Sequence, residues 1–160
     1  MPKVTAKDLV KLLDQKTIGK LNAAGWSLAL QASDLVRPLI DAFPLMQGHL
    51  GRKGVLWLLM RVVPAPDEVI DLAKAACFDK SYLVRSDAVE LLGRTLSDDV
   101  LPTLESLAND PDPRIAFSAR SHIFAVKQKD PDAVSDYWDA HSKEASEVFG
   151  KNAKGSKRRR

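Results

Sequence analysis

Apolar residues recur at helical spacing along this chain, and the pattern is clearest between Asp79 and Phe124. Two apolar helical runs are separated there by a short polar turn, after which the pattern starts again. A shift of 31 residues places the segment onto itself, with matching caps and apolar positions: Asp79 onto Asp110, Ser81 onto Asp112, Val84 onto Ile115, Ala88 onto Ala119 and Leu92 onto Ile123. The same shift in the other direction matches residues 98–110 with residues 67–79. The chain is therefore predicted to be an array of helical hairpins.

The hydrophobic pattern predicts an all-α protein with about four antiparallel hairpins behind a short capping helix. The hairpins pair residues 17–32 with 33–43, 55–60 with 68–78, 81–96 with 98–108, and 113–127 with 131–141. Residues 47–54 contain three glycines and are expected to form a turn, and residues 142–149 are expected to close the array. The expected N-terminal caps are a Thr5–Asp8 capping box, Ser33-Asp34, Asp67, Asp112 and Asp130.

The best-matched unit resembles the HEAT repeats, in particular the short repeats of bilin-lyase-like proteins. The resemblance rests on Asp79, Val84-Arg85, Ala88, Leu91-Leu92-Gly93, Pro102, Leu104, Leu107 and Asn109-Asp110-Pro111. It implies an α-solenoid in which the second helices of the hairpins line a concave face. It also implies that Arg85 pairs with Asp79 or Asp110 of neighbouring units. Since HEAT-like arrays carry many functions, the resemblance is mainly a statement about the fold.

Charge divides the chain into a body and a tail. The whole chain carries +3, but residues 151–160 alone carry six positive charges, so residues 1–150 carry −3. The body, with 45% hydrophobic residues in the chain as a whole, is long enough for one HEAT-like domain. The tail is expected to be a disordered, solvated end or a weak contact with nucleic acid or the ribosome. Its basic residues are Lys151, Lys154, Lys157, Arg158, Arg159 and Arg160.

Negative charge gathers on the predicted second helices, which sum to −9, whereas the first helices sum to +6. Asp67, Asp98 and Asp132 lie at helix starts, where a carboxylate satisfies free N–H groups. The remaining acidic residues are not needed as caps, and we expect them to bind a basic protein partner rather than only to face solvent. These predicted partner-binding residues are Asp71, Asp99, Glu105, Asp136 and Asp139.

No constellation for catalysis is found in the sequence. His49, His122 and His141 are far apart and have no partner at metal-ligand spacing. Cys77 lies at the apolar end of a helix and is expected to be a buried core thiol. Residues 48–54 resemble a phosphate-binding loop only loosely, because they lack a preceding strand and a metal-binding hydroxyl. We therefore expect no enzymatic activity, no cofactor, no metal and no small-molecule substrate.

Three classes of function remain open at this stage. The first is a non-enzymatic scaffold that binds a basic protein, such as an adaptor or a toxin-neutralising immunity protein. The second is a nucleic-acid-binding or DNA-repair protein that uses the basic tail and the arginines of the first helices. The third, a bilin lyase, rests on the resemblance alone. The longest apolar run, residues 55–60, is too short to span a membrane, and a cytoplasmic location is expected.

Overall fold

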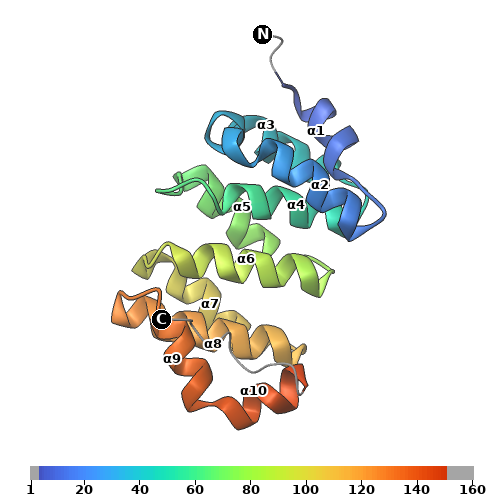
Figure 1. The fold of residues 1–160 in the computed structure, drawn as a ribbon. Coiled ribbons are helices and arrows are strands. Elements are labelled where there is room, and N and C mark those ends of the chain that lie inside the picture. The colour runs from blue at the N-terminus through green and yellow to red at the C-terminus, as the bar shows by residue number, and fades with distance from the viewer. Residues whose placement is uncertain (1–3, 151–160) are drawn as a thin grey trace, which may run out of the picture. The chain divides into compact units, whose positions relative to one another are not determined.

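Residues 4–150 are described by a computed structural model of the chain, and within that range every regular element is a helix (Figure 1). The prediction of an all-α fold is confirmed. The chain divides into two compact units at the Leu91–Leu92 bond, near the end of one helix.

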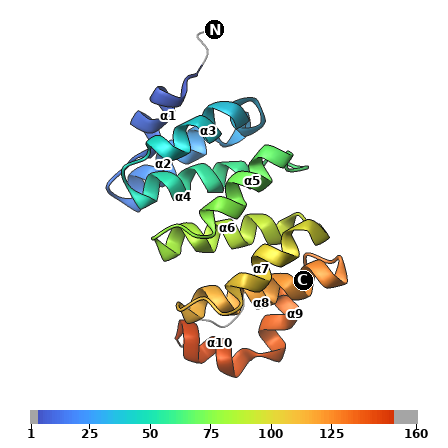
Figure 2. The same cartoon turned by 180° about the vertical axis from the view of Figure 1, so that it is seen from behind.

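The described part of the first unit is built from five α-helices, most of a sixth one and two 3₁₀ segments. α2 packs against α4, and both α1 and α5 pack against α3. In Figure 1 α2 and α4 face the viewer, whereas Figure 2 brings α3 and α5 to the front. The elements are α1 (Ala6–Leu13), α2 (Ile18–Leu28), η1 (Ala29–Leu35), α3 (Val36–Ala42), η2 (Phe43–Leu45), α4 (His49–Leu59), α5 (Asp67–Ala76) and α6 (Tyr82–Arg94).

The second unit is organised around its longest helix, α8 (Pro113–Gln128), which packs against all three other α-helices of the unit. Phe117 of α8 is fully buried, and it makes edge-on contacts with Tyr137, Trp138 and Phe149. Aromatic contacts of this kind tie the last two helices to the core. The other elements are η3 (Asp98–Val100), α7 (Leu101–Leu107), α9 (Ala133–Ala140) and α10 (Ser142–Phe149), the last of which was expected from the sequence.

The self-match in the sequence corresponds to a local structure that repeats. The carboxylate of Asp79 accepts a hydrogen bond from the N–H of Ser81 at 2.8 Å, and Asp110 accepts one from Asp112 at the same distance. The superimposed apolar positions are buried as well: Val84 and Ile115, Ala88 and Ala119, and Val69 and Val100 are each at most 1% exposed. The 31-residue period therefore reflects a recurring turn and a recurring apolar face.

Two of the expected helix starts are confirmed. Thr5 and Asp8 form a reciprocal capping box at the start of α1. Asp112 caps α8 by accepting the N–H of Arg114 at 3.0 Å, and Pro113 occupies the first helical position, where its missing N–H has little effect.

Three other cap predictions are wrong. Residues 29–35 continue from α2 into α3 as a 3₁₀ segment, so no free helix start exists for Ser33 or Asp34 to cap. Asp67 lies inside α5, whose N-cap is Pro66. Asp130 instead accepts the N–H of Asp132, and α9 begins only at Ala133.

The expected turn at residues 47–54 is also wrong, because α4 already begins at His49. The cause is a distant carboxylate: Asp14 accepts the N–H groups of Gln47 and Gly48 at 2.8 and 2.9 Å. These bonds satisfy backbone donors next to the helix start that no local side chain could reach. The glycines at positions 51 and 54 consequently lie inside a helix.

Candidate functional site

The predicted partner-binding residues fall in both units. Asp71 lies on α5 in the first unit. The other four belong to the second unit, with Asp99 in η3, Glu105 on α7, and Asp136 and Asp139 on α9. Both α7 and α9 pack against α8, and Asp136 and Asp139 are three residues apart on one helix face. The structure therefore brings four of the five predicted residues into one compact unit.

All five predicted carboxylates are exposed, and they make few internal contacts. Glu105 forms a loose ion pair with Lys127 at 3.8 Å, in which both side chains are more than half exposed. Asp71, Asp99, Asp136 and Asp139 form no ion pair with any residue between 4 and 150. These side chains are thus accessible to a partner, since an exposed pair such as Glu105–Lys127 contributes little and breaks easily.

The two units differ in charge. Between residues 92 and 150 there are eleven acidic and six basic residues, a net charge of −5. Residues 1–91 contain ten acidic and twelve basic residues, a net charge of +2. The net negative charge of residues 1–150 therefore comes from residues 92–150, although the sequence pattern placed acidic residues on all four predicted second helices.

Some acidic residues of the second unit have structural roles. Asp98 forms an ion pair with Lys129, whose ammonium also donates to the carbonyl of Leu96. Glu144 of α10 pairs with Arg120 of α8. Neither residue was predicted to bind a partner; the Arg120–Glu144 pair is partly buried, whereas the Asp98 side chain is 71% exposed.

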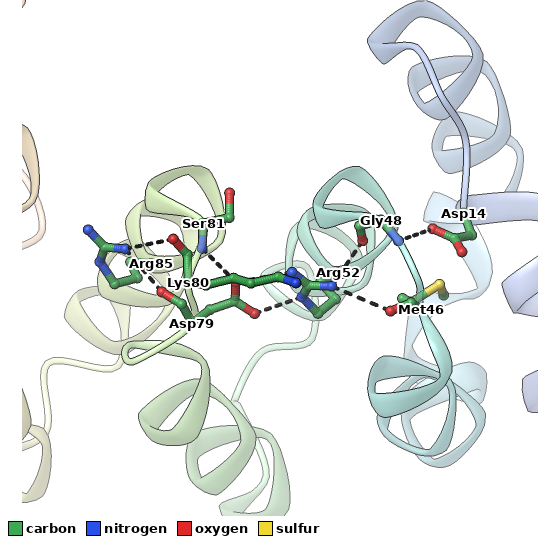
Figure 3. A network of polar contacts seen from close by, with 8 residues as sticks. All are labelled: Asp14, Met46, Gly48, Arg52, Asp79, Lys80, Ser81 and Arg85. Atoms are coloured by element: carbon green, nitrogen blue, oxygen red, sulfur yellow. Dashed lines mark hydrogen bonds and ion pairs between the residues drawn. The ribbon is translucent and has the colours of Figure 1, made fainter.

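A buried polar network is the main electrostatic feature of the first unit (Figure 3). Arg52 of α4 donates to both carboxylate oxygens of Asp79, at 2.7 and 3.1 Å, and each side chain is only 11% exposed. Burial favours protonation of Asp79, but the hydrogen bonds from Arg52 and the Ser81 N–H outweigh it, and the pKa of Asp79 lies below its usual value. Arg52 also donates to the carbonyls of Met46 and Gly48. The network joins α4 to the turn before α6.

Arg85 is adjacent to this network, and the resemblance predicted that it pairs with an aspartate. Its guanidinium donates to the backbone carbonyl of Asp79 at 3.0 Å, whereas the Asp79 carboxylate is held by Arg52 (Figure 3). Arg52 is therefore the residue that links Asp79 to a preceding helix, and the sequence pattern did not identify it.

The arginines of the first helices, which the nucleic-acid alternative invokes, are largely engaged within the protein. Arg52 is bonded to Asp79, Arg114 to Asp112, and Arg120 to Glu144 and the carbonyl of Ala108. Arg61 donates to the carbonyl of Trp57. The basic tail, Lys151 to Arg160, lies outside the described residues.

Residues that often carry chemistry are dispersed or buried. Cys77 is completely buried, as expected, and burial raises the pKa of its thiol to about 12. His122 is 8% exposed, and His141 stacks on Tyr137 with ring centroids 4.0 Å apart. Among residues 4–150, no three histidine, cysteine or acidic side chains are grouped as metal ligands would be. The same residues form no helix with the length and apolar character that crossing a bilayer requires.

Sequence reasoning missed a cluster of two tryptophans and an ion pair on α2, α4 and α6 of the first unit. Trp26 of α2 is 64% exposed and contacts Trp57 of α4 edge-on, with ring centroids 5.2 Å apart. Next to it, Lys53 forms an ion pair at 2.7 Å with Asp87, a carboxylate that is 7% exposed. Burial raises the pKa of Asp87 even though Lys53 opposes the shift. The four-residue spacing of Lys53 and Trp57 places both residues on one helix face, but the same spacing is also typical of a helix buried in the core.

Comparison with known proteins identified no relative, because neither a protein-family model nor a curated protein matches this chain.

Proposed function

We propose that the chain is a protein-binding module without catalytic activity, and that it binds a basic protein through exposed carboxylates of η3, α7 and α9. Asp99, Glu105, Asp136 and Asp139 of the second unit form this surface, and Asp71, the fifth predicted residue, lies in the first unit. An adaptor or a toxin-neutralising immunity protein in the cytoplasm would act in this way. The proposal includes a HEAT-like solenoid, for which the repeated aspartate turn is the main support.

The observation that carries the proposal is the contrast between two kinds of carboxylate in the second unit. Asp112 and Glu144 are held by basic side chains in partly buried contacts. The predicted residues are exposed and either lack an ion pair with a described residue or, for Glu105, have only a loose one. Exposed charges of one sign raise the local concentration of an oppositely charged partner and speed its association.

The test is capture of partners from lysate of the protein's own host, read by mass spectrometry. The immobilised chain is compared with a variant that carries Asp99→Lys, Glu105→Lys and Asp136→Lys. None of these substitutions removes the Ser97 cap of η3. We expect the wild-type chain to retain a basic protein that the variant loses.

A matched control changes the same amount of charge elsewhere. Asp34→Lys, Asp41→Lys and Glu147→Lys affect exposed carboxylates outside the predicted surface. This control should keep the partner. Equal capture by the wild-type chain and the first variant, or capture of acidic proteins alone, would contradict the proposal.

A further inference from the structure

A second surface lies on α2 and α4 of the first unit. Ile18, Asn22 and Trp26 are spaced by four residues on α2 and therefore share one face of that helix. Ile18 is 52% exposed and Trp26 is 64% exposed. Large apolar side chains that are so exposed on one helix face are typical of interaction sites.

A matching row lies on α4, which packs beside α2 (Figure 1). Lys53 and Trp57 are spaced by four residues, and Arg61 follows four residues later, just beyond the helix end. The guanidinium of Arg61 lies 3.5 Å from the ring centroid of Trp57 and 5.3 Å from that of Trp26. Tryptophan and arginine are the residues most often found as energetic hot spots of protein interfaces.

A pocket of about 250 Å³ opens between the two rows. Its walls include Ile18, Leu21 and Asn22 of α2, and Lys53 and Trp57 of α4. Gly25 completes the α2 wall, and a Cβ atom at this position would lie only 3.1 Å from the Trp57 ring. The absence of a side chain on Gly25 therefore lets the Trp57 ring approach α2 closely. The volume is below the range of roughly 300 to 1,000 Å³ of pockets for cofactors and drug-sized ligands, and it suits a single side chain.

The surroundings of the pocket contain no negative charge on α2 or α4. Residues 15–33 and 42–66 include five lysines and arginines and no aspartate or glutamate. Within the pocket, the Lys53 ammonium is already bound by both oxygens of Asp87, at 2.7 and 2.9 Å. Lys53 is therefore neutralised, whereas Arg61 lies against the two indole rings and carries a charge that favours a carboxylate.

We infer that the pocket between α2 and α4 receives one large apolar side chain of an acidic protein segment, with Trp26 packing beside that side chain and Arg61 pairing with a neighbouring carboxylate. This surface is separate from the proposed acidic one, and it takes a partner of the opposite charge.

A nucleic acid fits the surface less well. Nucleic-acid affinity rests on several phosphate contacts from lysine and arginine. Here Lys53 is neutralised by Asp87, Arg61 stacks on the Trp57 ring, and the pocket walls are mainly apolar. A single apolar anchor with flanking carboxylates matches the pocket size and the charge together.

The inference is tested by selecting binders of the full chain from a displayed library of short random peptides. Selected peptides should share one Leu, Phe or Trp next to Asp or Glu. Their affinity should fall about tenfold or more in Trp26→Ala, which removes a hot-spot side chain, and in Asn22→Trp, which fills the pocket. Both positions are exposed, so the fold should persist, and circular dichroism checks that it does.

Phe78→Ala is the matched control, because Phe78 is an aromatic residue of the same unit with 67% exposure that lies away from the pocket lining. It should leave peptide affinity unchanged. The inference would be overturned if no acidic peptide were selected, or if Trp26→Ala and Asn22→Trp bound the peptides as the wild-type chain does. Tighter binding of a single-stranded oligothymidylate, lost in the same two variants, would reassign the surface to nucleic acid.

Discussion

Individual residues show how the same sequence pattern can carry a structural or a functional role. Asp79 lies just before α6 and Asp99 lies in η3 just before α7, but Asp79 is bound by Arg52 inside the protein and Asp99 faces solvent. Only the three-dimensional contacts separate the two.

Cys77 should react very slowly in the native protein. Its thiol is fully buried, and a pKa of about 12 keeps it protonated at pH 8, whereas the thiolate is the reactive form. Labelling with Ellman's reagent should be at least about 100-fold slower than in the urea-unfolded chain, because it requires local opening. Rapid labelling in native buffer would show that Cys77 is accessible.

Asp79→Asn should destabilise the first unit by about 1 to 3 kcal/mol, since it leaves the buried Arg52 without its carboxylate. The folded pKa of Asp79 is lowered, so its contribution is present above the usual aspartate pKa and is lost as the pH falls through the folded value. The stability difference between wild type and variant should be constant near neutral pH and shrink below about pH 4.

Urea denaturation at several pH values measures this difference. Asp41→Asn is the control, because the Arg37–Asp41 pair is 70% and 46% exposed and should change stability by less than about 0.5 kcal/mol. If the two substitutions had equal effects, the Arg52–Asp79 network would not stabilise the fold.

At the scale of elements, the helices and their apolar faces could be predicted, but several of their starting points could not. The self-match located the buried positions Val84, Ile115 and Leu104, because helical periodicity depends only on the local sequence. The start of α4 depends on Asp14, which is 34 residues from Gly48 and invisible to any local rule. The sequence likewise predicted exposed carboxylates, but it could not reveal that most of them belong to one unit.

Close packing between helices gives a prediction at this scale. A Cβ atom on Gly93 would lie 2.1 Å from Nδ1 of His122, so α6 approaches α8 at a point where only glycine fits. Gly93→Ala should therefore cost about 1 to 3 kcal/mol in urea denaturation. Gly19→Ala is the control, because nothing lies within 4 Å of its added methyl group and alanine favours helix by up to about 1 kcal/mol. Equal stability of the two variants would contradict the close approach.

At the scale of the whole molecule, residues 1–91 carry a net charge of +2, residues 92–150 carry −5, and residues 151–160 add +6. The proposed acidic surface and the inferred α2–α4 pocket follow this division, and they would bind partners of opposite charge.

Stopped-flow association with the captured basic partner, at a series of salt concentrations, tests the central claim most directly. For the wild-type chain the association rate should be high at low salt and fall as screening increases, since the Debye length shortens to about 8 Å at physiological ionic strength. The Asp99→Lys, Glu105→Lys and Asp136→Lys variant should associate slowly, with little dependence on salt, while its helical content is unchanged. Equal rates and equal salt dependence for both proteins would mean that these carboxylates only face solvent.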